Sequence, residues 1–186
     1  MVVLFTSTFS GISIVWDRQF GFLREIMVAP ISRTTISLGR NLGGATTALI
    51  QGLIMIALSF LIGFKPSING LLFAFVFMFL IAVAFTGIGI AISTFMHDIH
   101  GFQIVINFFV FPIFLLSGAL FPISEFPKFV ATLALFDPLT YGVDGMRWAM
   151  IGYSEFNPLY DLAALLIFCI TIVFVSAVLF SKMEVE

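Results

Sequence analysis

The stretch DRQFGFLREIMVAPISRTTISLGR, residues 17–40, decides how the chain must fold, because it is the one long charged interval in an otherwise apolar sequence. It holds half of the eight basic residues of the chain, namely Arg18, Arg24, Arg33 and Arg40. One arginine at the centre of a membrane helix costs about 2.5–3.5 kcal/mol, so four would cost on the order of 10 kcal/mol. We therefore expect residues 17–40 to lie outside the hydrocarbon of a bilayer.

The same stretch has a helical pattern that breaks at a proline. Apolar side chains recur along one face of a short predicted helix: Trp16, Phe20, Leu23 and Met27. Pro30 disfavours helix at Ala29, and Ser32 is placed to cap a second helix that begins near Arg33. The pattern predicts a helix, a bend and a helix that enters the membrane. An interfacial helix with snorkelling arginines and no partner is the alternative interpretation.

Composition places the rest of the chain in a membrane. The sequence is 61% hydrophobic and 10% charged, against about 25% charged in soluble domains, and its mean hydropathy is +1.18. Long apolar runs favour helices over a barrel. A net charge of −2 gives no reason to expect a nucleic-acid partner, and a lone cysteine excludes a disulfide within the chain. We predict an all-α, polytopic helical membrane protein.

Five spans are predicted, at residues 1–16, 41–63, 68–95, 102–120 and 159–180. The first is short for a bilayer core of about 30 Å, so we expect one further span upstream. Pro112 is expected to kink the fourth span. Between the last two spans, residues 124–150 predict a re-entrant hairpin of two short amphipathic helices. Ser124 would cap the first, Asp137 and Pro138 would end it, and the second would carry an Asp144–Arg147 ion pair.

Polar residues inside the spans have two interpretations. Gln51, Gln103 and Asn107 either bond to neighbouring helices or line a transport path. His97 and His100 lie three residues apart, but no further ligand is near them, so we do not expect a metal site. Five basic residues near span ends lie on the side of residues 17–40 and three on the other. This bias predicts that the charged loop and the C-terminus lie on the cytoplasmic side of the membrane, which we expect to be the plasma membrane.

Two sequence blocks, in their order among the spans, carry a resemblance to a known family. The first is FGFLREIMVAPISRTTISLGRNL at residues 20–42, and the second is LLSGALFPISEFPKFVATLALFDPLTYGVDGMRW at residues 115–148. The arrangement resembles the permease subunits of type 2 ABC exporters, over nearly the whole chain. The resemblance implies six spans, of which the first is missing here, and export of drug-like, amphiphilic, lipid or polysaccharide substrates. It also implies a dimer with a second permease subunit.

The resemblance further implies roles for particular residues. The segment from Asp17 to Pro30 would be the coupling helix that sits in a cleft of a separate ATP-binding subunit, and the loop from His97 to Gly101 would be a secondary contact. The coupling residues would be Arg18, Phe20, Phe22, Leu23, Arg24, Glu25, Met27 and Pro30. The re-entrant outer hairpin would use Phe126, Phe129, Tyr141, Asp144 and Arg147 to close the translocation path.

The chain itself lacks the GxxxxGK[ST] loop that cradles the phosphates of ATP. We therefore expect no enzymatic activity and no bound cofactor in this chain, with ATP and Mg²⁺ held by the partner subunit. A secondary transporter or channel is the main alternative, although such proteins place ionisable residues at mid-membrane, where these spans show none. A membrane-embedded enzyme is a further alternative, but no triad or paired catalytic carboxylates can be assembled.

Overall fold

The computed structural model describes residues 1–28, 30–64 and 66–183, and these residues form helices and no strand. The all-α prediction is confirmed. The elements in chain order are α1 (Val2–Phe9), α2 (Ile12–Gln19), α3 (Phe22–Val28), α4 (Arg33–Leu61), α5 (Ile68–Ser93), α6 (Ile99–Leu116), the 3₁₀ turn η1 (Ile123–Glu125), α7 (Lys128–Ala134), α8 (Pro138–Ile151) and α9 (Pro158–Ser181).

Among the described residues, four helices are long and apolar enough to cross a membrane: α4, α5, α6 and α9. Three of them expose rows of large apolar side chains, such as Ile104, Phe108 and Phe111 on α6. Similar rows run along α4 and α9. Apolar surface on this scale is typical of a lipid-facing or protein-facing surface and not of one that meets water. The prediction of a polytopic helical membrane protein is confirmed.

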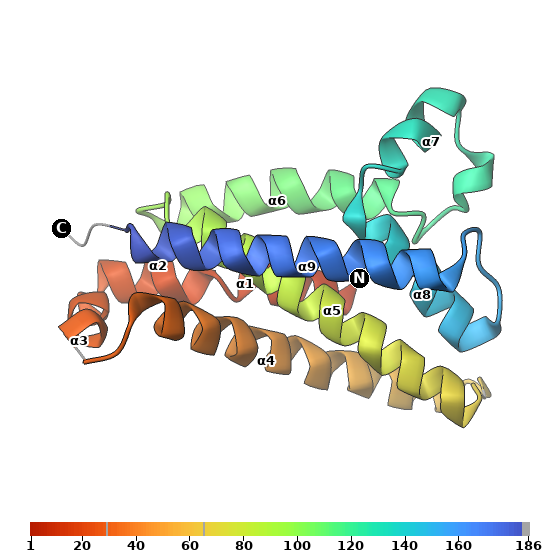
Figure 1. The fold of residues 1–186 in the computed structure, drawn as a ribbon, viewed down its shortest axis with the longest axis horizontal. Coiled ribbons are helices and arrows are strands. Elements are labelled where there is room, and N and C mark those ends of the chain that lie inside the picture. Colours follow the sequence, from red (N-terminus) through yellow and green to blue (C-terminus); the bar gives the residue numbers. More distant parts are fainter. Residues whose placement is uncertain (29, 65, 184–186) are drawn as a thin grey trace.

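Helix α5 is the centre of the bundle, as Figure 1 shows. It packs against α9, α8, α1 and α4, and every residue from 80 to 91 is buried. A helix that is apolar on all sides is typical of a protein core or of a membrane span, and residues 80–91 of α5 lie in the core of this bundle. The remaining elements are therefore arranged around α5, and the two ends of the bundle carry different features.

One end of the bundle gathers α3, the turn between α5 and α6, and the end of α9; we call it the α3 end (Figure 1). The opposite end, here the α7 end, gathers the end of α4, α7 and α8. Arg18, Arg33 and Lys182 lie at the α3 end, and Lys128 and Arg147 at the α7 end. The loop residue Lys65 lies outside the described residues.

The first predicted span, residues 1–16, is wrong as a single helix. It is divided into α1 and α2 at Ser10 and Gly11, and α2 continues to Gln19. Several hydroxyls near the break bond to carbonyls one turn earlier: those of Ser7, Thr8, Ser10 and Ser13. Such bonds compete with the helical ladder and bend helices. Hydroxyl-rich sequence therefore favours a break in the first span, which the contact with α5 described next makes stable.

Two glycines let the broken segment contact α5 backbone to backbone. A Cβ added at Gly89 of α5 would lie 2.2 Å from the carbonyl oxygen of Thr8, and one added at Gly11 would lie 2.3 Å from the carbonyl oxygen of Gly89. Neither contact leaves room for a side chain. Together they fix the crossing of the α1–α2 segment over the central helix.

The predicted helix with an apolar stripe from Trp16 to Met27 is also wrong, because α2 and α3 are separate. Gly21 lies between them at φ +79°, a backbone conformation that favours glycine. The second helix begins as predicted: the backbone N–H of Thr35 donates to Ser32 Oγ at 3.1 Å. Helix α4 therefore starts at Arg33, before the predicted span 41–63. The predicted break at Ala29 lies outside the described residues.

At the α7 end, the predicted caps of the hairpin are corrected. Ser124 lies inside η1, and the residue that precedes α7 is Pro127. Helix α7 ends at Ala134, and Asp137 begins α8 by accepting a hydrogen bond from the N–H of Leu139 at 2.9 Å. Aspartate before a proline is a favourable start for a helix, since proline has no N–H to satisfy. Pro112 lies within the continuous helix α6.

Candidate functional site at the α3 end

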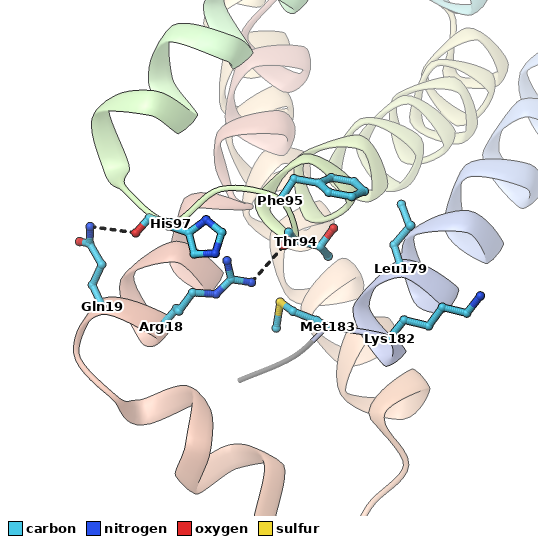
Figure 2. Close-up of a pocket in the computed structure, with 8 residues that line it drawn as sticks. All are labelled: Arg18, Gln19, Thr94, Phe95, His97, Leu179, Lys182 and Met183. Atoms are coloured by element: carbon cyan, nitrogen blue, oxygen red, sulfur yellow. Dashed lines mark hydrogen bonds between the residues drawn. The ribbon is translucent and has the colours of Figure 1, made fainter. Parts of the chain in front are cut away.

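Arg18, in the last turn of α2, joins that helix to the turn between α5 and α6. Its Nη1 donates to the carbonyl oxygen of Met96 at 2.7 Å and its Nη2 to that of Thr94 at 3.1 Å. Gln19 Nε2 donates to the carbonyl oxygen of His97 at 3.3 Å. Figure 2 shows Arg18 and Gln19 reaching across to this turn. The guanidinium thus faces the negative end of the α5 dipole.

Arg33, the first residue of α4, makes the corresponding contact at the end of α9. Its Nη1 donates to the carbonyl oxygen of Ser181 at 3.1 Å and to that of Met183 at 3.0 Å. A planar guanidinium can reach two carbonyls at once, which a lysine ammonium does less well. The end of the last long helix is therefore tied to the start of α4.

Arg40 forms an ion pair with Asp17 and donates through Nη1 to Ser13 Oγ at 3.3 Å. This pair joins α2 to α4 and is partly exposed. Three of the four arginines that were predicted to lie outside the hydrocarbon thus bind groups of this same chain. They connect α2, α4, α9 and the α5–α6 turn into one unit.

Among the described side chains of helix α3, Leu23 is the one that is fully buried against this unit, and others are exposed. Leu23 is fully buried in a small apolar cluster with Ile14, Ile90, Phe180 and Met183. These residues come from α2, α5, α9 and the residues just after α9. Phe22 is 56% exposed and Val28 is 84% exposed. The short helix therefore has a buried side at Leu23 and an exposed side that carries Phe22, Glu25 and Val28.

The structure places the predicted coupling residues in three groups. Arg18 is engaged within the chain, and Leu23 is buried. Four others are exposed, namely Phe20, Phe22, Glu25 and Pro30. The side chains of Arg24 and Met27 lie outside what the structure describes. Sequence reasoning gave Leu23 the same role as its neighbours, because a stripe pattern does not show which residue meets the bundle.

A pocket of about 480 Å³ opens beside these contacts. Its walls come from α2, the α5–α6 turn and the end of α9, and its lining residues are Arg18, Gln19, Thr94, Phe95, His97, Leu179, Lys182 and Met183 (Figure 2). The described lining is basic, polar and apolar, and holds no carboxylate.

At the α7 end, Asp144 and Arg147 of the predicted hairpin set belong to one polar cluster. Arg147 Nη2 donates to the carbonyl oxygen of Gly118 at 2.7 Å. Asp144 is buried and accepts from the N–H groups of Glu155 and Phe156 at 2.9–3.0 Å. The predicted Asp144–Arg147 pair is at 4.0 Å, so backbone N–H groups are the closer partners of this carboxylate.

The aromatic members of the predicted hairpin set lie nearer the surface. Tyr141 donates its hydroxyl to the carbonyl oxygen of Leu135 at 2.8 Å, and its ring packs against Phe156. Phe126 is partly buried, whereas Phe129 is 75% exposed on α7. The hydroxyl of Tyr141 thus links α8 to the loop after α7, and Phe129 is available to lipid or to a partner.

Two carboxylates beside this cluster were missed by sequence reasoning. Glu155 Oε1 lies 3.8 Å from Arg147 Nη1, and Asp161, in the first turn of α9, is fully buried with neither carboxyl oxygen bonded to a described donor. Asp161 follows the cap Asn157 in sequence, which made it resemble an ordinary acid of a helix start. Its burial depends on α8, which the sequence does not place.

The amides inside the long helices differ in their surroundings. Gln51 accepts a hydrogen bond from the hydroxyl of Thr6, which joins α4 to α1. Gln103 and Asn107 are exposed one turn apart on α6, beside Phe108. A buried amide that the sequence analysis did not name, Asn41, donates to the carbonyl oxygen of Val83 at 3.2 Å. Within the described residues no group of three His, Cys, Asp or Glu residues could hold a metal ion.

The family described as ABC-2 type transporter matches residues 1–151. Three relatives are transport proteins by name. The putative transport permease ycf38 of Pyropia yezoensis is 30% identical over 165 residues, which cover 84% of this chain and 55% of the relative. The probable doxorubicin resistance ABC transporter permease protein DrrC of Mycobacterium tuberculosis (strain CDC 1551 / Oshkosh) is 24% identical over 82% of this chain and 56% of its own length.

The inner membrane transport permease YadH of Escherichia coli (strain K12) is 23% identical over 80% of this chain and 57% of its own length. The chain thus spans about half the length of the curated relatives it matches. The family match extends from the broken first helix through the last residue of α8. The resemblance in the sequence is confirmed, and the chain belongs to the ABC-2 type transporter family.

Proposed function

We propose that this chain is a permease subunit of an ATP-driven exporter and that α3 is the element through which a separate ATP-binding subunit drives it. In this proposal the α3 end is cytoplasmic, the membrane is the plasma membrane, and ATP and Mg²⁺ are bound by the partner. The substrate is an amphiphilic molecule such as a drug, a lipid or a polysaccharide.

The observation that carries the proposal is the two-sided environment of α3. Leu23 holds the helix to the ends of α2, α5 and α9, while Phe22 and Val28 remain exposed. Exposed aromatic side chains on a firmly held element are typical anchors of a protein interface. A partner that moves α3 would also move α2, because Leu23 packs against Ile14 of that helix. Helix α2 is in turn joined to the α5–α6 turn by the hydrogen bonds of Arg18 and Gln19. Such rigid-body coupling is a known way to shift a transporter between states.

The transport path is proposed to involve the exposed face of α6. Gln103 and Asn107 are the only amide side chains of that helix, and both lie on its exposed face with Phe108. A helix with both polar and apolar exposed residues suits the interface with a second permease subunit or a path shared with it. The hairpin of α7 and α8 would close this path at the outer side.

The coupling role is tested with Phe22→Ala combined with charge reversal at Glu25, after co-expression with the ATP-binding subunit of the same transporter. We expect the variant to insert normally but to lose both co-purification with that subunit and ATP-driven transport. Phe129→Ala removes an even more exposed phenylalanine at the α7 end and serves as the control for co-purification. Unchanged co-purification and transport in the α3 variant would overturn the assignment.

Sidedness is tested separately by labelling single cysteines with a membrane-impermeant maleimide, after the native buried cysteine is replaced by Cys169→Ala. We expect Glu25→Cys to react only from the cytoplasmic side and Ser124→Cys only from outside. The opposite result would place α3 outside the cell, where no ATP-binding subunit exists. Transport that depends on a proton or sodium gradient, and not on ATP, would favour the secondary transporter.

A further inference from the structure

The pocket at the α3 end has positive charge that the contacts within the chain do not use. Arg18 donates to the neutral carbonyl oxygens of Met96 and Thr94 and forms no ion pair with a described carboxylate, so its charge is not neutralised within the described structure. Lys182 is exposed, and no described residue accepts a hydrogen bond from its ammonium. His97 adds a ring that faces Arg18 in Figure 2. The two cationic side chains of the described lining, Arg18 and Lys182, favour an anion in this pocket.

The other half of the lining is apolar and leads to the membrane surface of the bundle. Phe95 is 61% exposed, and Leu179 lies one turn after Val175, an exposed residue on the same face of α9. A small soluble anion would gain nothing from these side chains. An acyl chain that lies along α9 would contact them while its head group enters the pocket.

The position of the pocket fits the boundary between hydrocarbon and water. Lys182 directly follows α9, and Thr94 directly follows α5, so the lining begins where two long apolar helices end. Basic residues at the ends of membrane helices reach the level of lipid head groups. A volume of about 480 Å³ is ample for a phosphate with part of its glycerol.

We propose that this pocket binds the phosphate of an anionic phospholipid from the leaflet that meets the α3 end, with Arg18 and Lys182 as its cationic groups. The site depends on the chain spanning a bilayer, and it does not depend on α3 binding an ATP-binding subunit. A bound lipid would bridge α2, the α5–α6 turn and α9, and would thereby stiffen the unit that holds α3.

The test is native mass spectrometry of the full chain in detergent, with phosphatidylglycerol and phosphatidylcholine of identical acyl chains as the two probes. We expect selective retention of phosphatidylglycerol by the wild-type chain. Lys182→Gln should weaken that binding by about five-fold, the effect of one basic residue near an anionic lipid surface. Lys128→Gln removes an exposed lysine from the α7 end and should leave the binding unchanged.

Equal retention of the two lipids by the wild-type chain would overturn the proposal, as would equal losses in Lys182→Gln and Lys128→Gln. Inorganic phosphate distinguishes the source of the anion. If phosphate alone displaces the lipid at millimolar concentration, the site takes a soluble phosphate and the lipid assignment is wrong. Failure of α3 to bind an ATP-binding subunit would leave these results unaffected, so the two proposals are tested independently.

Discussion

The crossing of α1 and α2 over α5 predicts a large effect of adding a single methyl group to α5. In Gly89→Ala the new Cβ would lie 2.2 Å from the carbonyl oxygen of Thr8, whereas ordinary contacts begin at 3.4 Å. The obstacle is backbone and not the end of a flexible side chain, so α1 would have to retreat by about 1 Å. Overpacking of this kind costs about 1–3 kcal/mol, and alanine recovers about 1 kcal/mol of helix propensity.

We expect the backbone clash to place Gly89→Ala near the upper end of this range, with a net loss of about 2 kcal/mol. For a chain of this size that lowers the Tm by about 4–8 °C. Gly43→Ala is the matched control, since it lies inside α4 with nothing within 4 Å of the added Cβ, and it should raise the Tm slightly. The assay is thermal unfolding of the purified chain in detergent. Equal Tm values for the two variants would refute the close contact between the helices.

Three further predictions concern buried groups. Burial raises the pKa of Asp137 from 3.8 to about 7 although the N–H of Leu139 opposes the shift, so between these pH values the folded chain holds a proton that the unfolded chain releases. The contribution of this group to stability should therefore be greatest below pH 4 and decline up to about pH 7, by about 1.4 kcal/mol for each unit of pKa shift. Asp137→Asn should flatten this profile when thermal unfolding is measured at several pH values. Asp161→Asn should leave the Tm unchanged or raised, because its oxygens have no described donors, whereas Asp144→Ala should lower it by removing the acceptor for two N–H groups; an equal loss in both variants would contradict this reading. Leu23→Ala should lower the free energy that holds α3 against the bundle by about 2–5 kcal/mol, and amide hydrogen exchange in α3 should become faster. Exchange as slow as in the wild-type chain would show that Leu23 does not hold that helix.

The bounds of the long helices could be predicted closely because neighbouring residues in the sequence determine where these helices begin and end. Residues 68–95 and 159–180 were expected as spans, and the helices are Ile68–Ser93 and Pro158–Ser181. Ser67 and Asn157 accept N–H hydrogen bonds at the first turns of these helices, and the apolar runs that follow leave no other stable conformation in lipid. Ser32 before α4 is predictable for the same reason.

The break at Ser10 and the roles of the arginines could not be predicted in this way. Hydroxyl bonds near Ser10 are local, but the contact that makes the break stable is between Gly11 and Gly89, which are far apart in sequence. The cost of burying charge predicted that Arg18 and Arg33 lie outside the hydrocarbon. It did not predict that their partners are carbonyl groups at the ends of other helices, because those ends meet only in the folded bundle.

Because arginines bind carbonyl groups at the α3 end, the contacts within the chain should respond little to ionic strength. Salt screens pairs of exposed ions over distances of about 8–10 Å, whereas partly buried contacts to fixed dipoles are screened much less. Concentrated salt should therefore weaken the contacts that a partner makes with exposed charges such as Glu25, while the partly buried Arg18 keeps its hydrogen bonds. Purification in high salt would then weaken the binding of the proposed ATP-binding subunit without breaking the contacts between Arg18 and the α5–α6 turn.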